Sequence, residues 1–270
     1  MIIRNFINTN IGLSRAVDGV LPARLREDGN RHFRSHVLPH VLLPGSRVYD
    51  LGGGSRPCVD LADKQRLGLT IVGLDISAEE LALAPAGVYD KTIAADLCSF
   101  VGDQEADLVV CQATLEHVPD TPGALRAIAS CLKPGGIAVL FAPCRNAAFA
   151  RLNLLLPQEL KRKILFAIFP QKAEGHDGFR AYYDHCTPRD IERLAAANGL
   201  QVQERRLFWI SSYFTAFTPL FVLWRFMQGL HYLVVREQAA ETFWYVLVRP
   251  RRQGPSGGSS DGGLALQASD

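Results

Sequence analysis

The sequence predicts an α/β domain built on a mainly parallel β-sheet. Two observations lead to this prediction: β-prone runs alternate with helical stretches through the middle of the chain, and the runs are almost continuously apolar. Strands that are buried on both faces have this character, whereas strands with one solvated face alternate apolar and polar residues. The alternation of strands and helices further predicts right-handed crossovers between parallel strands.

The predicted strands are short and bounded by turn-forming residues. They cover residues 46–51, 70–75, 91–94, 106–111, 136–142, 201–207 and 242–248. Helices are predicted over residues 77–84, over 121–132 and between Thr187 and Gly199. Ser77 and Thr187 can act as N-caps, and Pro188 fits the first helical position, where its missing N–H needs no partner.

The domain is expected to span residues 46–250, with three kinds of additional segment. These are a helical N-terminal segment (1–45), two insertions (144–186 and 208–241) and a C-terminal tail (251–270). The first insertion is expected to contain an amphipathic helix over 157–169. The tail is rich in Gly and Ser and too poor in large apolar side chains to pack, so we expect it to be disordered.

Composition excludes several classes of function. A net charge of +2 over 270 residues does not provide the basic surface of a nucleic-acid binder. The six cysteines lie far apart and form no CxxC pair, so neither a metal site nor a thioredoxin-like site is expected. No charged segment followed by an apolar run stands at the amino terminus, so we expect no secretory signal and a cytoplasmic protein.

A glycine-rich turn follows the first predicted strand. The glycines of residues 50–54 (DLGGG) let the backbone turn sharply and approach a ligand without a Cβ in the way. Asp75 ends the second strand about 20 residues later, where an acidic side chain commonly accepts hydrogen bonds from ribose hydroxyls. The pair predicts a ligand containing a nucleoside, and the alternative is a plain glycine turn with a helix-capping aspartate.

Three more motifs follow in order: Asp96 after the third strand, residues 107–118 (DLVVCQATLEHV) and residues 132–136 (LKPGG). In this order and spacing, the motifs resemble class I S-adenosylmethionine-dependent methyltransferases, particularly the group related to quinone-biosynthesis methyltransferases. The resemblance covers residues 46–143 and, more loosely, 187–248. It implies a Rossmann-like, doubly wound sheet of seven mostly parallel strands, with helices on both faces, an antiparallel last strand and helical lid insertions.

The resemblance also implies which residues bind the methyl donor, S-adenosylmethionine. They are Asp50, Gly52, Gly54, Asp75, Asp96, Leu97 and Gln112. Gly52 and Gly54 would pass under the methionine part, and Asp75 would hold the ribose diol. Asp96 would meet the adenine amino group beside the backbone of Leu97. Gln112 would lie near the sulfonium.

Two residues beyond the glycines bear on the donor's identity. Arg56 stands where many relatives have a third glycine, which predicts a reshaped loop around the carboxylate end of the donor. A dehydrogenase would show the G-x-G-x-x-G spacing, and Pro57 occupies its last position here. NAD chemistry therefore ranks well below methyl transfer.

A base would assist methyl transfer to a hydroxyl, typically by ~10²–10⁴-fold. Candidate bases are His117, His176, Tyr182, Tyr183 and His185, of which Tyr183, His185 and His117 are taken as the candidate catalytic residues. For His117, a site-shaping role is favoured over that of a base. For the cluster in the first insertion, ordinary loop polarity with an aromatic anchor is an equal alternative.

Both insertions leave from the carboxyl ends of strands, so they are expected on the donor side of the sheet as a lid. Their apolar content favours a lipid-like or aromatic acceptor or peripheral contact with a membrane surface. Helices that fill their own small core are an equal alternative. Residues 207–224 approach the ~18-residue length of a membrane span. Polar residues interrupt this run, however, and it lies between two strands of one sheet, so interfacial contact is favoured over spanning.

The sequence favours transfer of a methyl group to oxygen of a small or lipid-linked acceptor, such as a saccharide, a polyketide or a lipid intermediate. A carbon methyltransferase of the quinone type is the alternative enzyme. The alternative outside catalysis is a donor-binding protein that uses the apolar lid as a partner surface.

Overall fold

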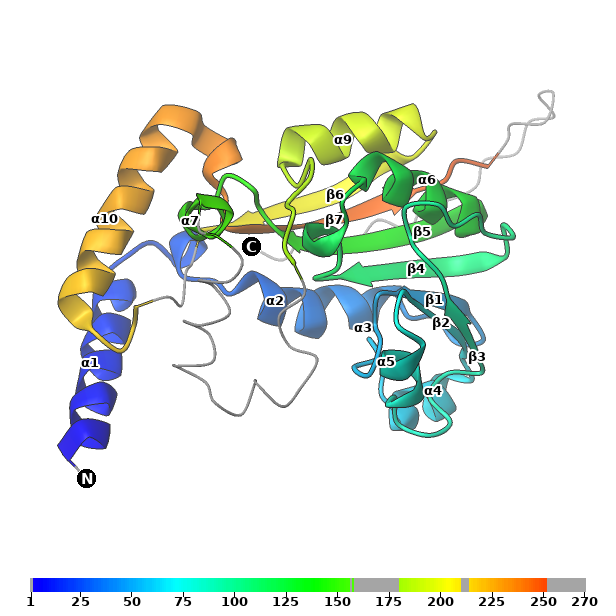
Figure 1. Cartoon of the computed structure of the whole chain (residues 1–270), viewed down its shortest axis with the longest axis horizontal. Helices are drawn as coiled ribbons and strands as arrows, with labels where there is room; N and C mark the ends of the chain where they lie inside the picture. Colours follow the sequence, from blue (N-terminus) through cyan, green and yellow to red (C-terminus); the bar gives the residue numbers. More distant parts are fainter. Residues whose placement is uncertain (1, 156, 158–179, 210–213, 252–270) are drawn as a thin grey trace.

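A seven-stranded sheet forms the centre of the computed structural model, which describes residues 2–155, 157, 180–209 and 214–251 (Figure 1). The strands are β1 (Arg47–Leu51), β2 (Thr70–Asp75), β3 (Lys91–Ala94), β4 (Ala106–Gln112), β5 (Leu132–Pro143), β6 (Gln201–Phe208) and β7 (Thr242–Val248). Their order is β3-β2-β1-β4-β5-β7-β6. Strand β7 runs antiparallel to β5 and β6, and the pairs from β3 to β5 are parallel. The predicted fold class is confirmed.

Short helical elements connect the strands or precede them. They are α1 (Ile2–Gly19), η1 (Ala23–Leu25), α2 (Gly29–His32), η2 (Phe33–Val37), α3 (Leu38–Val41), α4 (Leu61–Leu67), α5 (Ala78–Ala82), η3 (Leu115–His117), α6 (Thr121–Cys131), α7 (Ala148–Leu155), α9 (Pro188–Ala197), α10 (Thr218–Val235) and η5 (Arg236–Ala239). The predicted caps are present, because Ser77 accepts a hydrogen bond from the Glu80 N–H and Thr187 from the Asp190 N–H.

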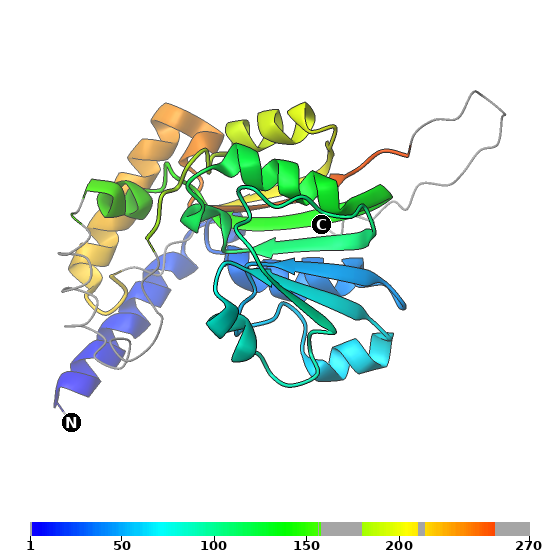
Figure 2. The same ribbon diagram turned by 45° about the vertical axis from the view of Figure 1, so that its right-hand side comes forward.

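Alternate residues along the strands face two separate cores. On one face, residues such as Leu51 and Val109 pack in a core that extends beneath α6 and α9. On the other face, Val48 and Val110 pack with residues of α2–α3 and α4, among them the fully buried Phe33. Helices therefore cover both faces of the sheet, and part of the N-terminal segment belongs to the core (Figures 1 and 2).

Strand β5 begins earlier than the sequence predicts. Its first residue is Leu132, so the turn expected over 132–136 lies within the bounds of the strand. Ala106 pairs with Leu132 and Leu108 with Ile137, so the turn residues form an irregularity in the β4–β5 ladder. The Gly135 N–H donates to the Arg249 carbonyl at 2.7 Å, which fixes this turn against the chain beyond β7.

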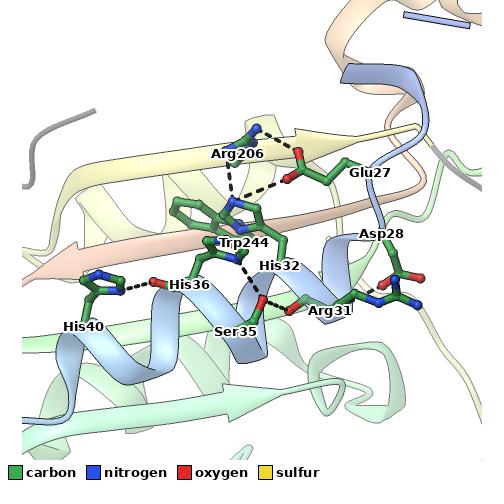
Figure 3. Close-up of polar contacts among 9 residues, drawn as sticks. All are labelled: Glu27, Asp28, Arg31, His32, Ser35, His36, His40, Arg206 and Trp244. Carbon is green, nitrogen blue, oxygen red and sulfur yellow. Dashed lines mark hydrogen bonds and ion pairs between the residues drawn. The ribbon is translucent and has the colours of Figure 1, made fainter. Parts of the chain in front are cut away.

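Helix α2 is fastened to the last two strands, as Figure 3 shows. The His32 ring lies between Arg206 of β6, whose Nη1 is 2.9 Å from Nε2, and Trp244 of β7, which donates from Nε1 to Nδ1 at 3.3 Å. Burial and then the Arg206 charge lower the pKa of His32. Gly29 approaches these strands so closely that a Cβ would collide with Thr242 and with the Phe208 ring.

Helices α1 and α10 pack together and extend away from the sheet at the edge where β4 ends (Figures 1 and 2); we call the pair the helical arm. Helix α10 and η5 belong to the second predicted insertion, and α7 to the first. Within the described residues, no helix is long and apolar enough to cross a membrane. The helix predicted over 157–169 and nearly all of the predicted tail lie outside the described residues.

Candidate active site

A cavity of about 870 Å³ opens at the carboxyl ends of β1, β2 and β4. The strand order reverses between β1 and β4, and open α/β sheets bind their ligands at such a switch point. All seven predicted donor-binding residues line the cavity: Asp50, Gly52, Gly54, Asp75, Asp96, Leu97 and Gln112. The structure therefore brings this predicted set together, and the role of each residue stays a prediction.

The glycine turn forms one wall of the cavity. Gly52 has a φ of 77°, and a Cβ there would collide with the Thr114 side chain. Gly54 has a φ of 48° and lies so close to Asp75 that a Cβ would be 3.1 Å from its Oδ2. Only glycine adopts such a backbone at little cost, so the turn holds the main chain open toward the cavity.

The buried carboxylate of Asp50 anchors this turn by hydrogen bonds. It accepts from the Cys58 N–H at 2.8 Å and from the Tyr89 hydroxyl at 3.0 Å. Burial raises the pKa of Asp50, and the two hydrogen bonds oppose that shift. Because these bonds engage the buried carboxylate, Asp50 shapes the loop as well as lining the cavity.

Asp75 presents a half-buried carboxylate at the end of β2. Its Oδ1 accepts from the Ser77 N–H at 3.0 Å, so the first residues of the α5 turn orient it. Burial, partly opposed by that hydrogen bond, raises the pKa of Asp75. Beside it, Ser55 donates to Glu80 at 2.7 Å and ties the glycine turn to α5.

The remaining predicted donor contacts occupy the far side of the cavity. Asp96 is exposed, with one carboxylate oxygen accepting from the Cys98 N–H at 2.8 Å, and Leu97 is buried. Gln112 donates from Nε2 to Asn30 of α2 at 2.7 Å. The N-terminal helix α2 thereby closes the side of the cavity at the end of β4.

Sequence analysis missed Asn30 and Arg34 as cavity residues. Asn30 lines the cavity from α2 and Arg34 from η2, although α3 and strand β1 separate both residues from the glycine turn in the sequence. Among the described residues, Arg34 and Arg56 are the arginines that line the cavity. The Arg/His-rich stretch over residues 31–40 was the available signal, but sequence alone does not show that it folds back onto the sheet.

Glu116 is, with Asp50, a buried acid of the site, and the sequence did not predict a role for it. It lines the cavity with 6% of its surface exposed, and its Oε2 is buried without a hydrogen-bond partner. Burial raises the pKa of Glu116 to about 8. Its backbone carbonyl accepts from the N–H groups of Tyr182 and Tyr183 at 2.8 and 3.0 Å, which docks the end of the first insertion.

His117 lines the cavity next to Glu116. Its Nδ1 lies 3.1 Å from the Arg180 carbonyl, an arrangement that requires Nδ1 to carry the proton and donate it. In the neutral ring, Nε2 then carries the lone pair. A general base needs this tautomer when its Nδ1 is held by a hydrogen bond.

Tyr183 and His185 do not line the cavity. The Tyr183 side chain is 6% exposed and lies within the hydrophobic core. The His185 Nδ1 lies 2.8 Å from the carboxylate of Asp184. Both have positive φ values, 50° and 47°, because the chain turns tightly where it docks under Glu116. Their predicted catalytic role stays a prediction, and His176 lies outside the described residues.

The cavity suits S-adenosylmethionine. Its volume falls in the ~300–1,000 Å³ range of small-molecule sites. It combines a carboxylate for a ribose diol, a glycine wall that a Cβ would obstruct, and arginines for the carboxylate of the methionine part. Within the described part of the chain, no group of three or more His, Cys, Asp or Glu residues is arranged to hold a metal ion.

Comparison with known proteins agrees with this chemistry. Two curated relatives are ubiquinone biosynthesis O-methyltransferases. That of Aeromonas salmonicida is 32% identical over 59% of this chain and 65% of its own length. That of Xanthomonas campestris is 30% identical over 63% and 68%. The match to the first thus spans slightly less than two thirds of that relative.

Solved structures share the fold at low identity. They include the [4+2]-cyclase SpnF (TM-score 0.52, 17% identity, covering 91% of this chain and 93% of that one). The geranyl diphosphate C-methyltransferase of Streptomyces coelicolor also matches (0.51, 13%, 81% and 79%). A model of the family described as "Methyltransferase domain" matches residues 23–205. Because that match covers more than half of the chain, the protein belongs to the methyltransferase domain family, and with it to the class I S-adenosylmethionine-dependent methyltransferases.

Proposed function

We propose that this protein transfers a methyl group from S-adenosylmethionine to an oxygen atom of a small or lipid-linked acceptor, such as a saccharide, a polyketide or a lipid intermediate. The observation that carries the proposal is the convergence of the seven donor-binding candidates and His117 on one cavity. Oxygen is favoured as the target because the curated relatives are O-methyltransferases. The proposal includes a peripheral contact with a membrane, from which a lipid-linked acceptor would reach the cavity.

The donor residues act by positioning. Asp75 accepts hydrogen bonds from the ribose diol, and Arg34 or Arg56 pairs with the donor's carboxylate. The bound donor supplies a methyl group on a positively charged sulfonium, and transfer requires the acceptor oxygen in line with the bond that breaks. The sulfur keeps that bond's electron pair, and the acceptor's proton must leave.

His117 accepts that proton on Nε2 in this proposal. The Arg180 carbonyl fixes the ring through Nδ1, so Nε2 keeps its lone pair. Glu116 stays protonated at neutral pH because burial raises its pKa to about 8, so it adds no negative charge beside the imidazole. Tyr183, which does not line the cavity, supports this base indirectly, because its N–H donates to the Glu116 carbonyl and so docks the end of the insertion that carries Arg180. His185 has no assigned part in this proposal.

Calorimetry with S-adenosylmethionine or S-adenosylhomocysteine tests the donor half. Asp75→Ala should weaken binding by about 1–3 kcal/mol, roughly 5- to 150-fold, because buried ribose hydroxyls lose a charged acceptor. Asp103→Ala, which removes a carboxylate that does not line the cavity, is the matched control and should bind normally. Binding of NAD in place of the methyl donor would refute the assignment.

The acceptor half is tested with a panel of hydroxyl-bearing phenols, sugars and polyketides, with and without an apolar tail. The readouts are S-adenosylhomocysteine release and the acceptor's gain in mass. His117→Ala should lower kcat by about 10²–10⁴-fold without changing donor affinity, because a base acts on the acceptor's proton alone. His185→Ala is the comparison. If it lowers kcat and His117→Ala does not, the base is His185.

A further inference from the structure

Helix α10 exposes an apolar face and buries most of its polar side chains. Its inward positions hold the polar residues Thr218, Arg225, Gln228 and His231 together with the apolar or aromatic residues Phe221, Trp224, Tyr232 and Val235. Its exposed positions carry only leucine, valine, phenylalanine, methionine, proline and glycine. Phe226 and Leu233 are each 61% exposed. Surface helices of globular proteins bury the apolar stripe and expose the polar one, so this face lacks an apolar partner among the residues that the structure describes.

Polar contacts hold the two helices of the arm together. The Asn10 side chain of α1 accepts from the Thr218 N–H at 2.9 Å, and Ser14 donates to the Thr215 carbonyl at 3.0 Å. The Arg225 Nε lies 2.9 Å from the Asp18 carboxylate, with both side chains largely buried. Polar groups between helices and apolar groups outside are the pattern of helix pairs packed in lipid.

The apolar face is too large to be a pocket for one acceptor. Helix α10 has 18 residues, a length of about 27 Å, and its exposed apolar positions run from one end to the other. Helix α1 adds Phe6 and Leu13, which are 54% and 53% exposed. Contiguous exposed apolar surface on this scale marks an interaction site for a protein or a membrane.

The charges of the arm decide between these partners. Among the described side chains of its two helices and the residue after α10, the cations are Arg15, Arg225 and Arg236, and the acid is Asp18. Asp18 already faces Arg225, so the arm keeps a positive charge. A second copy would bring like charges together. An anionic bilayer offers an apolar layer for the exposed face and negative headgroups for the arginines.

We propose that the helical arm lies in the plane of an anionic lipid bilayer, with the exposed face of α10 in the acyl layer. The inference rests on the membrane contact of the proposed function and specifies its surface. It does not depend on which acceptor is methylated. The arm extends from the edge of the sheet at which β4 ends and the donor cavity opens (Figure 2). Docking of the arm therefore brings the cavity close to the lipid surface.

Co-sedimentation of the full chain with vesicles tests the proposal. Phosphatidylglycerol–phosphatidylethanolamine vesicles should bind the protein, and phosphatidylcholine vesicles should bind it much less. The double variant Leu223→Glu, Phe226→Glu should bind at least about tenfold more weakly, since two large apolar side chains no longer enter the acyl layer. Val101→Glu is the control, because Val101 is 78% exposed but lies outside the arm.

Donor affinity, measured by calorimetry on the same samples, separates this inference from the proposed function. Unchanged donor binding with weakened vesicle binding supports the arm as the docking surface. Equal vesicle binding by the double variant would overturn the proposal. The proposal would also be overturned if the wild type bound none of the vesicles and formed a dimer, seen by light scattering, that the double variant does not form.

The arginines provide a second, independent measurement. Arg15→Glu and Arg236→Glu should each weaken binding to the anionic vesicles by about fivefold or more, and raising the salt concentration should have the same direction of effect. Binding that is indifferent to both changes would show that headgroup charge has no part, and would refute the choice of an anionic surface.

Discussion

The sheet and the helical arm distribute their apolar residues in opposite ways. The sheet buries apolar residues on both faces, so that Val109 and Val110 are both fully buried on neighbouring positions of β4. The arm buries Asn10 and Ser14 and leaves Leu223 and Phe226 exposed. Hydrophobic burial stabilises the first region in water, and polar contacts organise the second. If the arm docks on a bilayer as we propose, stability and membrane affinity therefore reside in different parts of the molecule.

A matched pair of leucine substitutions tests this contrast most strongly. Leu125 in α6 is fully buried, and Leu223 in α10 is 55% exposed. Leu125→Ala should lower the free energy of unfolding by about 2–5 kcal/mol, from lost burial and the cavity left behind. Leu223→Ala should change it by less than about 0.5 kcal/mol. Denaturant titrations of both variants without lipid supply the comparison, and equal losses would show that α10 packs like a core helix.

Removing a buried polar partner should affect the arm and spare the sheet. Burial raises the pKa of Asp18, and the Arg225 charge opposes this shift, so burying the ion pair is costly. The pair therefore matters mainly because each charge neutralises the other, and removing one partner would leave the other buried and unpaired. Asp18→Ala leaves Arg225 without its anion and should cost about 1–3 kcal/mol locally. Hydrogen exchange should show faster exchange in α1 and α10 with unchanged protection in β4 and β5. A uniform loss of protection across the arm and the sheet would contradict this division between the two regions.

A third prediction concerns the core and the pH dependence of its stability, which the buried carboxyl of Glu116 sets. Folding raises the pKa of Glu116 from 4.5 to about 8, so the folded state holds a proton that the unfolded state has released between those values. The free energy of unfolding should therefore fall as pH rises through this window, with a slope approaching ~1.4 kcal/mol per pH unit. Glu116→Gln should flatten that dependence. A wild-type curve that is already flat from pH 5 to 8 would mean that the carboxyl is hydrated.

Elements specified by neighbouring residues were predicted well. Strand β7 and the α9 cap follow from a continuous apolar run and from Thr187-Pro188, and the structure has both where the sequence indicates. The resemblance to class I methyltransferases supplied the donor-binding candidates, and the structure brings them to one cavity because they follow the ends of neighbouring strands. The start of β5 was missed, because pairing with β4 and the chain beyond β7 decides whether residues 132–136 extend the strand.

Features that depend on distant contacts were not predictable in the same way. Asn30 reaches the cavity because α2 packs on β6 and β7, and two of its contacts there join residues 174 and 212 positions apart in the chain. The sequence of α10 is apolar on several sides and does not show which side points outward. The contacts of Asn10 with Thr218 and of Asp18 with Arg225 show which side packs against α1.

The close approach of Gly29 to Thr242 and Phe208 links the donor cavity to strands that follow it far along the chain. Helix α2 packs directly on side chains of β6 and β7, and β7 lies between β5 and β6 in the sheet. The cavity wall that Asn30 provides therefore depends on two strands on the side of the sheet away from β2 and Asp75. A substitution that places a side chain at Gly29 would accordingly disturb the donor site from outside it, with the glycine turn and Asp75 left unchanged.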